Sequence, residues 1–489
     1  MNRNYVLSSV SVLLISISLF AQGSIVSTKL SLTEVIQLAI SQSTAALRAE
    51  TIKENRYWQY RTYRSNYVPQ LELSGTLPDF NRSFTPVIQQ DGTTQFREVF
   101  INNSNLTLGI SQTIAATGAQ IFINSRLDRF DDFENKLTTY SGNPAVIGII
   151  QPLFSFNQLK WDKRIEPLRY EESKRDFVEQ KEGISRIASG LFFEVLIAQI
   201  SLKIARLNVQ SNDTIYQIAQ GRYALGKIPE NDLLQLELNL MNSRQQVAQA
   251  NLDLETSTLS LKSYLGFKED VAFDLLVPNV LPGFAVDEQL ALKEANENRQ
   301  EAIAFQRRKL EAEREVARAT GDTGLNANLF ATFGLTNQAN NLSGVYQSPQ
   351  DQQRVRIGFS IPIIDWGRQQ SRVKRAEANR KLVEYTVDQD RINFEQEVFT
   401  LVKQFKMLRD QITITSQSDL ISQRRYTISK NRYLIGKISI TDLSLALTEK
   451  DSAKRTYINS LRDFWDAYYN LRRLTLYDFE NNLRLYTSE

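Results

Sequence analysis

The sequence contains no cysteine and no histidine in its 489 residues. Disulfide bonds, a thioether-linked lipid, Ser-His-Asp and Cys-His nucleophiles, and the usual zinc-ligand sets are therefore excluded. Lys plus Arg number 58 against 55 Asp plus Glu, a near balance that gives no reason to expect nucleic acid as a partner. Chemistry by carboxylates or lysine would still be possible, but no cluster of these residues indicates an active site. We expect no enzymatic activity and no cofactor.

Long apolar runs are also scarce, and the clearest one stands at the N-terminus. Residues 2–4 are weakly basic, Val6–Phe20 is apolar, and Ala21 precedes a plausible cleavage point, so we interpret residues 1–22 as a signal peptide. A single transmembrane anchor is the alternative, but the run is shorter than the ~20 residues that a spanning helix needs. No later segment approaches a spanning helix in length or apolarity, so any membrane insertion must use β-strands.

One stretch of the chain occurs twice. GRYALGKIPENDLLQ at Gly221–Gln235 is repeated as NRYLIGKISITDLSL at Asn431–Leu445, at a constant offset of 210 (432 − 222). The offset indicates an internal duplication. In each copy aromatic and basic residues end one helix, glycine permits a left-handed cap, and Asp232 or Asp442 can cap the next helix. The two turns predict two long helical hairpins.

Long helical patterns flank these turns. Residues 157–221 and 367–431 repeat apolar positions in coiled-coil fashion, and each would span roughly 100 Å as a helix. Plain bundle packing would also account for the apolar stripes, but not for this length. Two shorter patterns, Leu32–Tyr67 and Val286–Ala319, each predict one further helix, which precedes the strands of its repeat.

Alternating residues predict β-strands at about 70–154 in the first repeat and about 325–364 in the second. The clearest strand has large apolar side chains on one face and arginine, glycine and serine on the other. The two sets are Val355, Ile357, Phe359, Ile361 and Ile363, and Arg354, Arg356, Gly358 and Ser360. A membrane-barrel strand with a lipid-facing and a water-lined side has this pattern, and so does an amphipathic strand of a soluble sandwich. Phe156 and Trp366, just beyond the strands, fit an interfacial aromatic belt.

The strand region of the first repeat is longer by roughly 45 residues (83 from Pro69 to Pro152, against 38 from Gly324 to Pro362). The extra segment predicts a hairpin around residues 106–127. Such a hairpin could lie outside the cell or extend a barrel wall.

Without this hairpin, each chain supplies four strands. Single-chain membrane barrels start at about eight strands, and unpaired edges are not tolerated in lipid, so the wall must be shared between copies. Two copies would give about eight strands and a filled bore. Three copies would give about twelve strands around a passage.

From Leu32 to about Leu476 the chain resembles the TolC-like outer-membrane efflux proteins. The resemblance rests on LTEVIQLAI, PQLELSG, QPLF at Gln151–Phe154, IPIIDWG at Ile361–Gly367 and both RYxxGKIxxxDL turns, in duplicated order. It implies a mixed fold in which long antiparallel coiled-coil helices form an α-barrel across the periplasm. Four β-strands per chain would contribute to a shared twelve-stranded barrel in outer-membrane lipid, and the assembly would be a homotrimer.

The resemblance also implies a passive exit duct for efflux or type I secretion. The paired turns would form its periplasmic entrance, which docks on a periplasmic adaptor protein and an inner-membrane transporter of the RND or ABC type. At the tips of the turns, we expect Gly226, Lys227, Gly436 and Ile438 to lie at the adaptor contact.

Three side chains near the turns hold the entrance of the family closed. They are a tyrosine three residues before the second turn glycine, an arginine two residues after it, and an aspartate six residues after the first turn glycine. The matching residues here are Tyr433, Ile438 and Asp232, so the arginine is missing, and Lys437 or Arg432 could replace it. A tyrosine that only packs and an aspartate that only caps a helix would fit the same positions.

These patterns divide the chain into five segments. They are the signal peptide 1–22, a first repeat 23–265, a connector 266–284 lying against the bundle, a second repeat 285–477 and a tail 478–489. The alternative function is a periplasmic or surface coiled-coil scaffold without a pore.

A ring of acids narrows the pore of the family; Asp442 matches its first position, and Leu445 replaces the second. Carboxylates from three subunits at one constriction would attract cations and repel anions. We predict that Asp442→Asn weakens cation preference in planar-bilayer recordings. An unchanged reversal potential in a salt gradient would rule out this role for Asp442.

Overall fold

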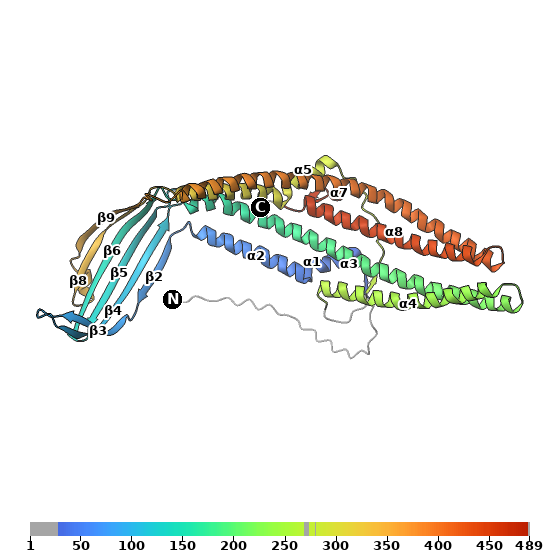
Figure 1. Cartoon of the computed structure of the whole chain (residues 1–489), viewed down its shortest axis with the longest axis horizontal. Coiled ribbons are helices and arrows are strands. Elements are labelled where there is room, and N and C mark those ends of the chain that lie inside the picture. Colours follow the sequence, from blue (N-terminus) through green and yellow to red (C-terminus); the bar gives the residue numbers. More distant parts are fainter. Residues whose placement is uncertain (1–27, 268–272, 279, 488–489) are drawn as a thin grey trace, which may run out of the picture. The chain divides into compact units, whose positions relative to one another are not determined.

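The computed structural model describes residues 28–267, 273–278 and 280–487, so the predicted signal peptide lies outside the described residues. The chain divides into two compact units. The first comprises Met1–Ser43, Ala188–Leu281 and Ser422–Asn459, and the second comprises Thr44–Ile187, Pro282–Ile421 and Ser460–Glu489. The first unit contains both repeated turns, and the second contains the large sheet (Figure 1).

The two predicted helical hairpins are present. Helices α3 (Gln158–Ala224) and α7 (Arg368–Leu434) each have 67 residues, and α4 (Glu230–Leu265) and α8 (Ile440–Thr475) each have 36. Every bound in the second hairpin is 210 higher than its counterpart in the first (368 − 158, for example), which is the offset of the repeated sequence. Helix α3 continues through Pro167.

The expectation that no later segment has the apolarity of a spanning helix is wrong for α3. Among the described residues, it is the one helix with an 18-residue window apolar enough to cross a membrane, and half of that window is buried inside the structure. Phe192, Phe193 and Leu196 are fully buried. The run therefore reflects a packed helical core.

The two shorter helical patterns are each broken, which corrects the prediction of single helices. The first gives α1 (Leu32–Gln42) and α2 (Thr44–Ser65), and the second gives α5 (Glu288–Asn298) and α6 (Gln300–Gly321). The residues at the breaks, Ser43 and Arg299, have extended backbone conformations. At the second break the guanidinium of Arg299 is buried in an ion-pair cluster with Glu179 (3.1 Å) and Glu301 (2.8 Å).

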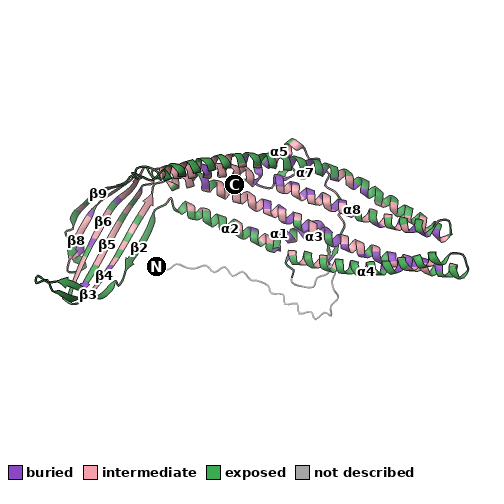
Figure 2. Cartoon of the chain, viewed as in Figure 1, coloured by how far each residue is buried: buried purple, intermediate pink, exposed green. Residues whose placement is uncertain are grey.

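The second unit contains one antiparallel sheet of seven strands in the order β2-β4-β5-β6-β8-β9, with β3 paired to β4 beyond the end of β2. The strands are β2 (Gln70–Thr76), β3 (Phe80–Ile88), β4 (Thr94–Thr113), β5 (Gln120–Asp132), β6 (Leu137–Leu153), β8 (Asn326–Ala339) and β9 (Gln350–Ser360). The two outermost strands, β2 and β9, are exposed along almost their whole length (Figure 2).

Several short elements complete the fold. Strands β1 (Thr28–Leu30) and β7 (Phe273–Leu275) pair in the first unit, and β10 (Tyr477–Asp478) and β11 (Leu483–Arg484) pair in the second. The 3-10 helix η1 (Ser343–Tyr346) packs against β6 and β8.

The sheet has more strands than the four per chain that the sequence analysis counted with the extra hairpin left out. The predicted extra hairpin exists as β4 and β5, joined by a turn at Gly118 (φ 76°), and both strands pair along their full length with neighbours in the sheet. The sequence-based count omitted them because a strand period does not tell whether a hairpin joins an existing sheet. The expectation of a twelve-stranded barrel came from three chains with four strands each, and that count does not include β4 and β5.

Opposite residues in an antiparallel pair share a face. The register sets Leu71, Ile110, Ile123, Ile147 and Phe333 opposite one another in a row across five strands, and all five are exposed. On β9 the predicted alternation also holds, with Val355, Ile357 and Phe359 exposed on the same side. The sheet thus has one continuous apolar face.

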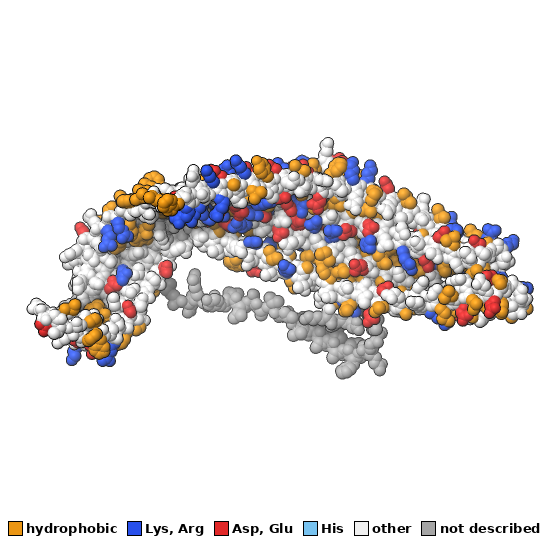
Figure 3. Space-filling view, viewed as in Figure 1, with side chains coloured by type: hydrophobic (Ala, Val, Ile, Leu, Met, Phe, Trp, Pro, Cys, Tyr) orange, Lys and Arg blue, Asp and Glu red, His pale blue; other side chains and the backbone are white. Residues whose placement is uncertain are grey.

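The two predicted belt aromatics differ in surroundings. Trp366 is 94% exposed and follows an exposed apolar run that includes Ile361, Ile363 and Ile364. Figure 3 shows hydrophobic side chains gathered where the sheet meets the start of α7, beside a group of lysines and arginines. Phe156, by contrast, lies under the guanidinium of Arg318, 4.9 Å from its ring centre. Only Trp366 is free to sit at a membrane interface.

Helices α3 and α8 in the second unit are held by ion pairs that differ in burial. Arg472 bridges Glu182 (2.8 Å) and Asp478 (2.7 Å), all with side chains at most 17% exposed. Arg186 pairs with Asp466 at 2.7 Å, with both side chains about two-fifths exposed (39% and 43%).

We predict that Arg472→Leu destabilises the protein by about 3–5 kcal/mol, because it leaves the buried carboxylate of Glu182 without its ion-pair partner. The substitution also takes the cation from Asp478, which keeps its hydrogen bonds from Glu480 and Asn481. Arg186→Leu, the matched control on a pair between the same helices, should cost at most about 1 kcal/mol. Unfolding followed by the helical circular dichroism signal in detergent measures both. Equal destabilisation by the two substitutions would contradict the claim that the buried ion pair of Arg472 stabilises the protein more than the exposed pair of Arg186.

Candidate functional site

The two repeated turns have the same backbone geometry. Gly226 and Gly436 both have positive φ (67° and 74°), as predicted for left-handed caps. In the first turn the amides of Gly226 and Lys227 donate to the carbonyls of Tyr223 (2.8 Å) and Arg222 (2.9 Å). The second turn repeats both bonds between the residues 210 positions later, each at 2.9 Å. Each helix therefore ends in a Schellman motif.

The helices that follow are not capped as predicted. Asp442 lies in the first turn of α8, where its carboxylate accepts from the amide (3.2 Å) and the hydroxyl (2.8 Å) of Ser439; the Ser439 hydroxyl accepts from the Asp442 amide (3.1 Å). Ser439 is therefore the cap, and Asp442 completes a capping box. Helix α4 follows Pro229, whose side chain makes no cap hydrogen bond, and Asp232 lies in its first turn. The N-cap residues are Pro229 for α4 and Ser439 for α8, where the sequence analysis expected Asp232 and Asp442.

The carboxylate of Asp442 is exposed and charged. Hydrogen bonds from the hydroxyl and the amide of Ser439 hold its pKa below the usual value. Because the folded pKa is depressed, the capping box contributes stability above the unfolded pKa and loses it as the pH falls through the folded pKa. Asp442 can therefore act as a cap and as a fixed negative charge at the same time.

Tyr433 is part of a hydrophobic core that joins the two hairpins in the first unit. It is 6% exposed, and the buried members of the core are Ile215, Ala219, Leu236, Tyr433, Ile440 and Leu443. Burial raises the pKa of the Tyr433 hydroxyl; the positive charge of Arg222 opposes this rise, and the negative charge of Asp232 adds to it. Within the described tip no hydrogen bond links the Tyr433 and Asp232 side chains, so their part in closing the entrance stays a prediction.

Arg222 makes the contact that the sequence analysis did not assign. From the last turn of α3 its guanidinium donates to the carbonyl oxygen of Tyr433 (3.3 Å) and to that of Leu434. The guanidinium carbon lies 5.9 Å from the centre of the Tyr433 ring. These carbonyls belong to the end of α7, where backbone acceptors lack intrahelical partners. Arg222 thus ties the end of one hairpin to the other.

The repeat itself contained a signal for this role, because Arg222 aligns with Arg432. In the part of the chain that the structure describes, Arg432 and Lys437 are exposed and form no ion pair. Neither replaces the missing arginine at Ile438 within one chain. Gly226, Lys227 and Gly436 are exposed and Ile438 is half-buried, so their role in adaptor contact stays a prediction.

Further polar contacts join the hairpins behind the turns. The hydroxyls of Ser211 and Tyr426 are 3.0 Å apart, and the Asn239 amide donates to the Ser444 hydroxyl at 3.3 Å. Deeper in the unit, the amide of Asn208 donates to the buried carboxylate of Asp451 at 2.5 Å. The tip is therefore held by a core and a short series of hydrogen bonds, in which the charged groups are Arg222, Lys450 and Asp451.

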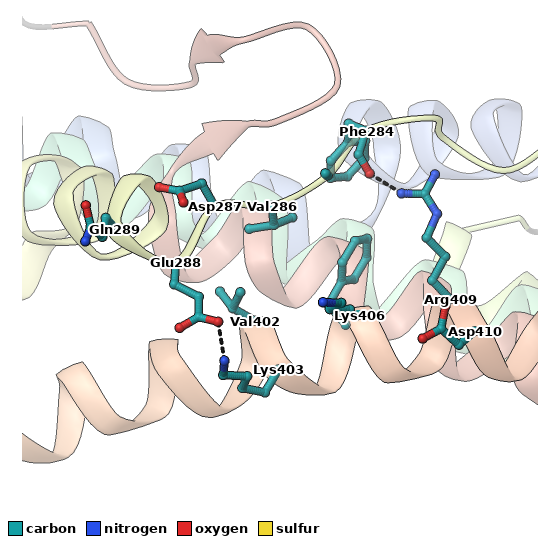
Figure 4. A pocket seen from close by; sticks show the side chains of 12 residues that line it. Phe284, Val286, Asp287, Glu288, Gln289, Val402, Lys403, Lys406, Arg409 and Asp410 are labelled. Atoms are coloured by element: carbon teal, nitrogen blue, oxygen red, sulfur yellow. Dashed lines mark hydrogen bonds and ion pairs between the residues drawn. The ribbon is translucent and has the colours of Figure 1, made fainter.

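A hollow of 620 Å³ in the second unit lies between residues 284–289 and α7 (Figure 4). Lys403 pairs with Glu288 across it, and Arg409 donates to the carbonyls of Phe284 and Pro282 (2.8 Å to Pro282). These bonds hold the end of the connector on α7. No group of acids that could hold a metal ion occurs among the described residues.

The comparisons with known proteins agree with this architecture. A family model described as outer membrane efflux protein matches residues 122–267 and 291–475. Similar solved structures are CusC (15% identity, TM-score 0.63, 91% of each chain covered) and OprN (14%, 0.65, 92% of this chain and 90% of that one). The CmeC outer membrane channel of Campylobacter jejuni has 17% identity and a TM-score of 0.63, over 91% of this chain and 85% of that one. A search of curated proteins gave no match.

We predict that Arg222→Met speeds backbone hydrogen exchange at the end of α7 and in the turn after it, because the freed carbonyls leave that turn less firmly held. Lys437→Met, which removes a nearby charge of the same sign that has no ion-pair partner, is the control and should leave exchange unchanged. Mass-spectrometric exchange of peptides covering residues 430–442 measures both. Identical exchange in the two variants would show that Arg222 does not tie the hairpins together.

Proposed function

The chain belongs to the outer membrane efflux protein family, and on this premise we propose that three copies form an outer-membrane channel through which cargo passes without chemical change. A periplasmic adaptor and an inner-membrane transporter of the RND or ABC type deliver the cargo, for efflux or for type I secretion. The helical turns form the entrance on the periplasmic side.

The observation that carries the proposal is a sheet with an apolar face and two open edges. The row from Leu71 to Phe333 would be exposed to water in a soluble protein, although apolar patches of this size are rare there. In lipid the same face is stabilised, but the free backbone groups of β2 and β9 then need partners. Neighbouring copies supply them when β2 of one chain pairs with β9 of the next.

The helices favour the same assembly. On α7 an exposed apolar stripe follows the heptad spacing with one step of eight; its members are Tyr385, Ile392, Phe399, Met407, Ile414 and Ile421. In the first unit α4 exposes a second stripe at coiled-coil spacing, made of Leu234, Leu238, Met241, Leu252 and Leu259. Such stripes pack into the grooves of another helix. A ring of copies gives each stripe a partner.

At the entrance, the proposal assigns two tasks. Three copies of Asp442 form a ring of negative charge that favours cations. Arg222 and the core around Tyr433 hold the two hairpins of each chain together, and Asp232 is the further member that the family resemblance implies, so opening requires the hairpins to move apart. Arg432 and Lys437, exposed beside the second turn, are available to acids of a neighbouring copy or of the adaptor.

The rival function, a scaffold without a pore, requires the sheet to be a soluble cap. The apolar face argues against it, because within the described residues η1 is the one helix with more than marginal contact to the sheet. A soluble cap would need a second layer over that face.

We predict that the protein fractionates with outer membranes, migrates as a heat-sensitive trimer on gels, and gives discrete conductance steps in planar bilayers. The sharpest variant is Ile357→Arg on β9, which places a charge on the lipid face at a cost of about 2–4 kcal/mol and should reduce insertion. The control is Gly358→Arg, the next residue, which faces the other side and has room for a side chain. A soluble, non-conducting protein, or equal insertion of both variants, would contradict the proposal.

A further inference from the structure

We infer that the hairpin β4–β5 is part of the membrane wall, so that the trimer forms an eighteen-stranded barrel with a bore for bulky hydrophilic cargo. The inference rests on the proposed function, and it concerns the width and therefore the substrate class of the same channel. It replaces the twelve strands expected from the sequence.

The topology places the hairpin inside the sheet. In the second repeat the two strands β8 and β9 pair directly. Their counterparts in the first repeat, β2 and β6, are separated by β4 and β5, which pair with them on either side. The family match begins at residue 122, so β2 and β4 lie outside it. Six strand positions per chain, from β2 to β9, lie side by side.

The apolar face continues across the hairpin without a gap. Ile110 on β4 lies opposite Leu71 on β2, and Ile123 on β5 lies opposite Ile147 on β6. All four side chains are exposed to a similar degree, from 45% to 67%. If the hairpin lay outside the membrane, water would surround these positions, and apolar side chains there would not be favoured. Its apolar side chains occupy the depth of those on β6 and β8.

The opposite face of the hairpin is polar, as a water-filled bore requires. Ser74, Thr107 and Arg126 form one row across β2, β4 and β5. Arg126 is neutralised by Asp128 on the same face, at 2.7 Å. The inner surface of the hairpin therefore offers hydroxyl and amide groups and little net charge.

The inner side chains are also fitted to the neighbouring strands. A Cβ atom added at Gly109 of β4 would lie 2.4 Å from the side-chain oxygen of Asn124 on β5. One added at Gly148 of β6 would lie 2.3 Å from the ring of Phe122, also on β5. Glycines on both sides thus leave space for the inner side chains of β5. This fit ties β5 into the wall from both neighbours.

Six strands per chain in a ring of three give eighteen strands. Barrel diameter grows roughly linearly with strand number, so the bore is about 1.5 times as wide as that of a twelve-stranded barrel. Barrels of 16–18 strands leave an aqueous channel. A wide and polar bore suits large hydrophilic solutes, whereas small apolar compounds would not need it.

The first test uses single cysteines, which the cysteine-free chain permits without background. Ile110→Cys and Ile123→Cys probe the apolar face of the hairpin, and Thr107→Cys and Asn124→Cys probe its polar face. Val355→Cys on β9 is the control for a lipid-facing wall position. Each protein is labelled with an environment-sensitive fluorophore and placed in vesicles of brominated phosphatidylcholine.

We expect several-fold stronger quenching at positions 110 and 123 than at positions 107 and 124. The quenching at 110 and 123 should equal that at the control position 355. If position 355 is quenched but the four hairpin positions are not, the hairpin lies outside the membrane and the inference fails while the proposed function stands. If position 355 is not quenched either, the sheet is not in lipid, and both fail.

The second test measures width. Replacing residues 77–140 by Asn-Gly removes the hairpin with β3 and lets β2 pair with β6, with Leu71 opposite Ile147 and the apolar face kept. Neutral polymers of graded size, added to the outer side of channels in planar bilayers, are then tested for entry. The natural chain should admit polymers of about 1.5-fold larger radius than the shortened one. If the two channels admit polymers of the same maximum size, or if the natural chain forms a dimer, the inference is overturned. If the shortened chain does not fold, the cysteine test alone decides.

Discussion

A backbone N–H or C=O group without a partner costs several kcal/mol in the hydrocarbon of a membrane. The sheet of this chain meets that requirement at its inner strands, which are paired on both sides, and fails it at β2 and β9. Its apolar face is stable in lipid, but its edges are not stable there unless another chain pairs with them. The self-association around a bore that we propose would satisfy both conditions, and the number of strands would then set the width of the bore.

The same requirement operates at the helical tip, on a smaller scale. The last carbonyls of α7 have no intrahelical donors, and Arg222 of the other hairpin supplies them. The core around Tyr433 excludes water from this contact. The hairpins can therefore separate only when a partner or a conformational change replaces both the core contacts and the arginine. These contacts fit the proposal that the tip is a gate, which opens when a partner protein or a conformational change replaces them.

The helical part of the fold was predictable from the sequence because it depends on local signals. The glycines of the two turns required positive φ, and the repeat at an offset of 210 placed α7 and α8 once α3 and α4 were placed. The breaks at Ser43 and Arg299 were missed because neither residue is a helix breaker; at Arg299, a buried ion-pair cluster accompanies the extended backbone. The placement of β4 and β5 was left open, since period-two alternation identifies strands but not their partners. At the site, the closure expected from Tyr433 and Asp232 stays a prediction, whereas Arg222 acts on backbone carbonyls that no side-chain pattern reveals.

Pairing between the two open edges is the central claim, and an engineered disulfide tests it most directly. Pairs of cysteines, one along β2 (Gln70–Thr76) and one along β9 (Gln350–Ser360), are introduced into the cysteine-free chain and oxidised in the membrane. The account predicts that some register pairs give covalent dimers and trimers on denaturing gels, and nothing larger, because a ring of three is closed. Chains that stay monomeric at every register, or a ladder that continues beyond three, would contradict it.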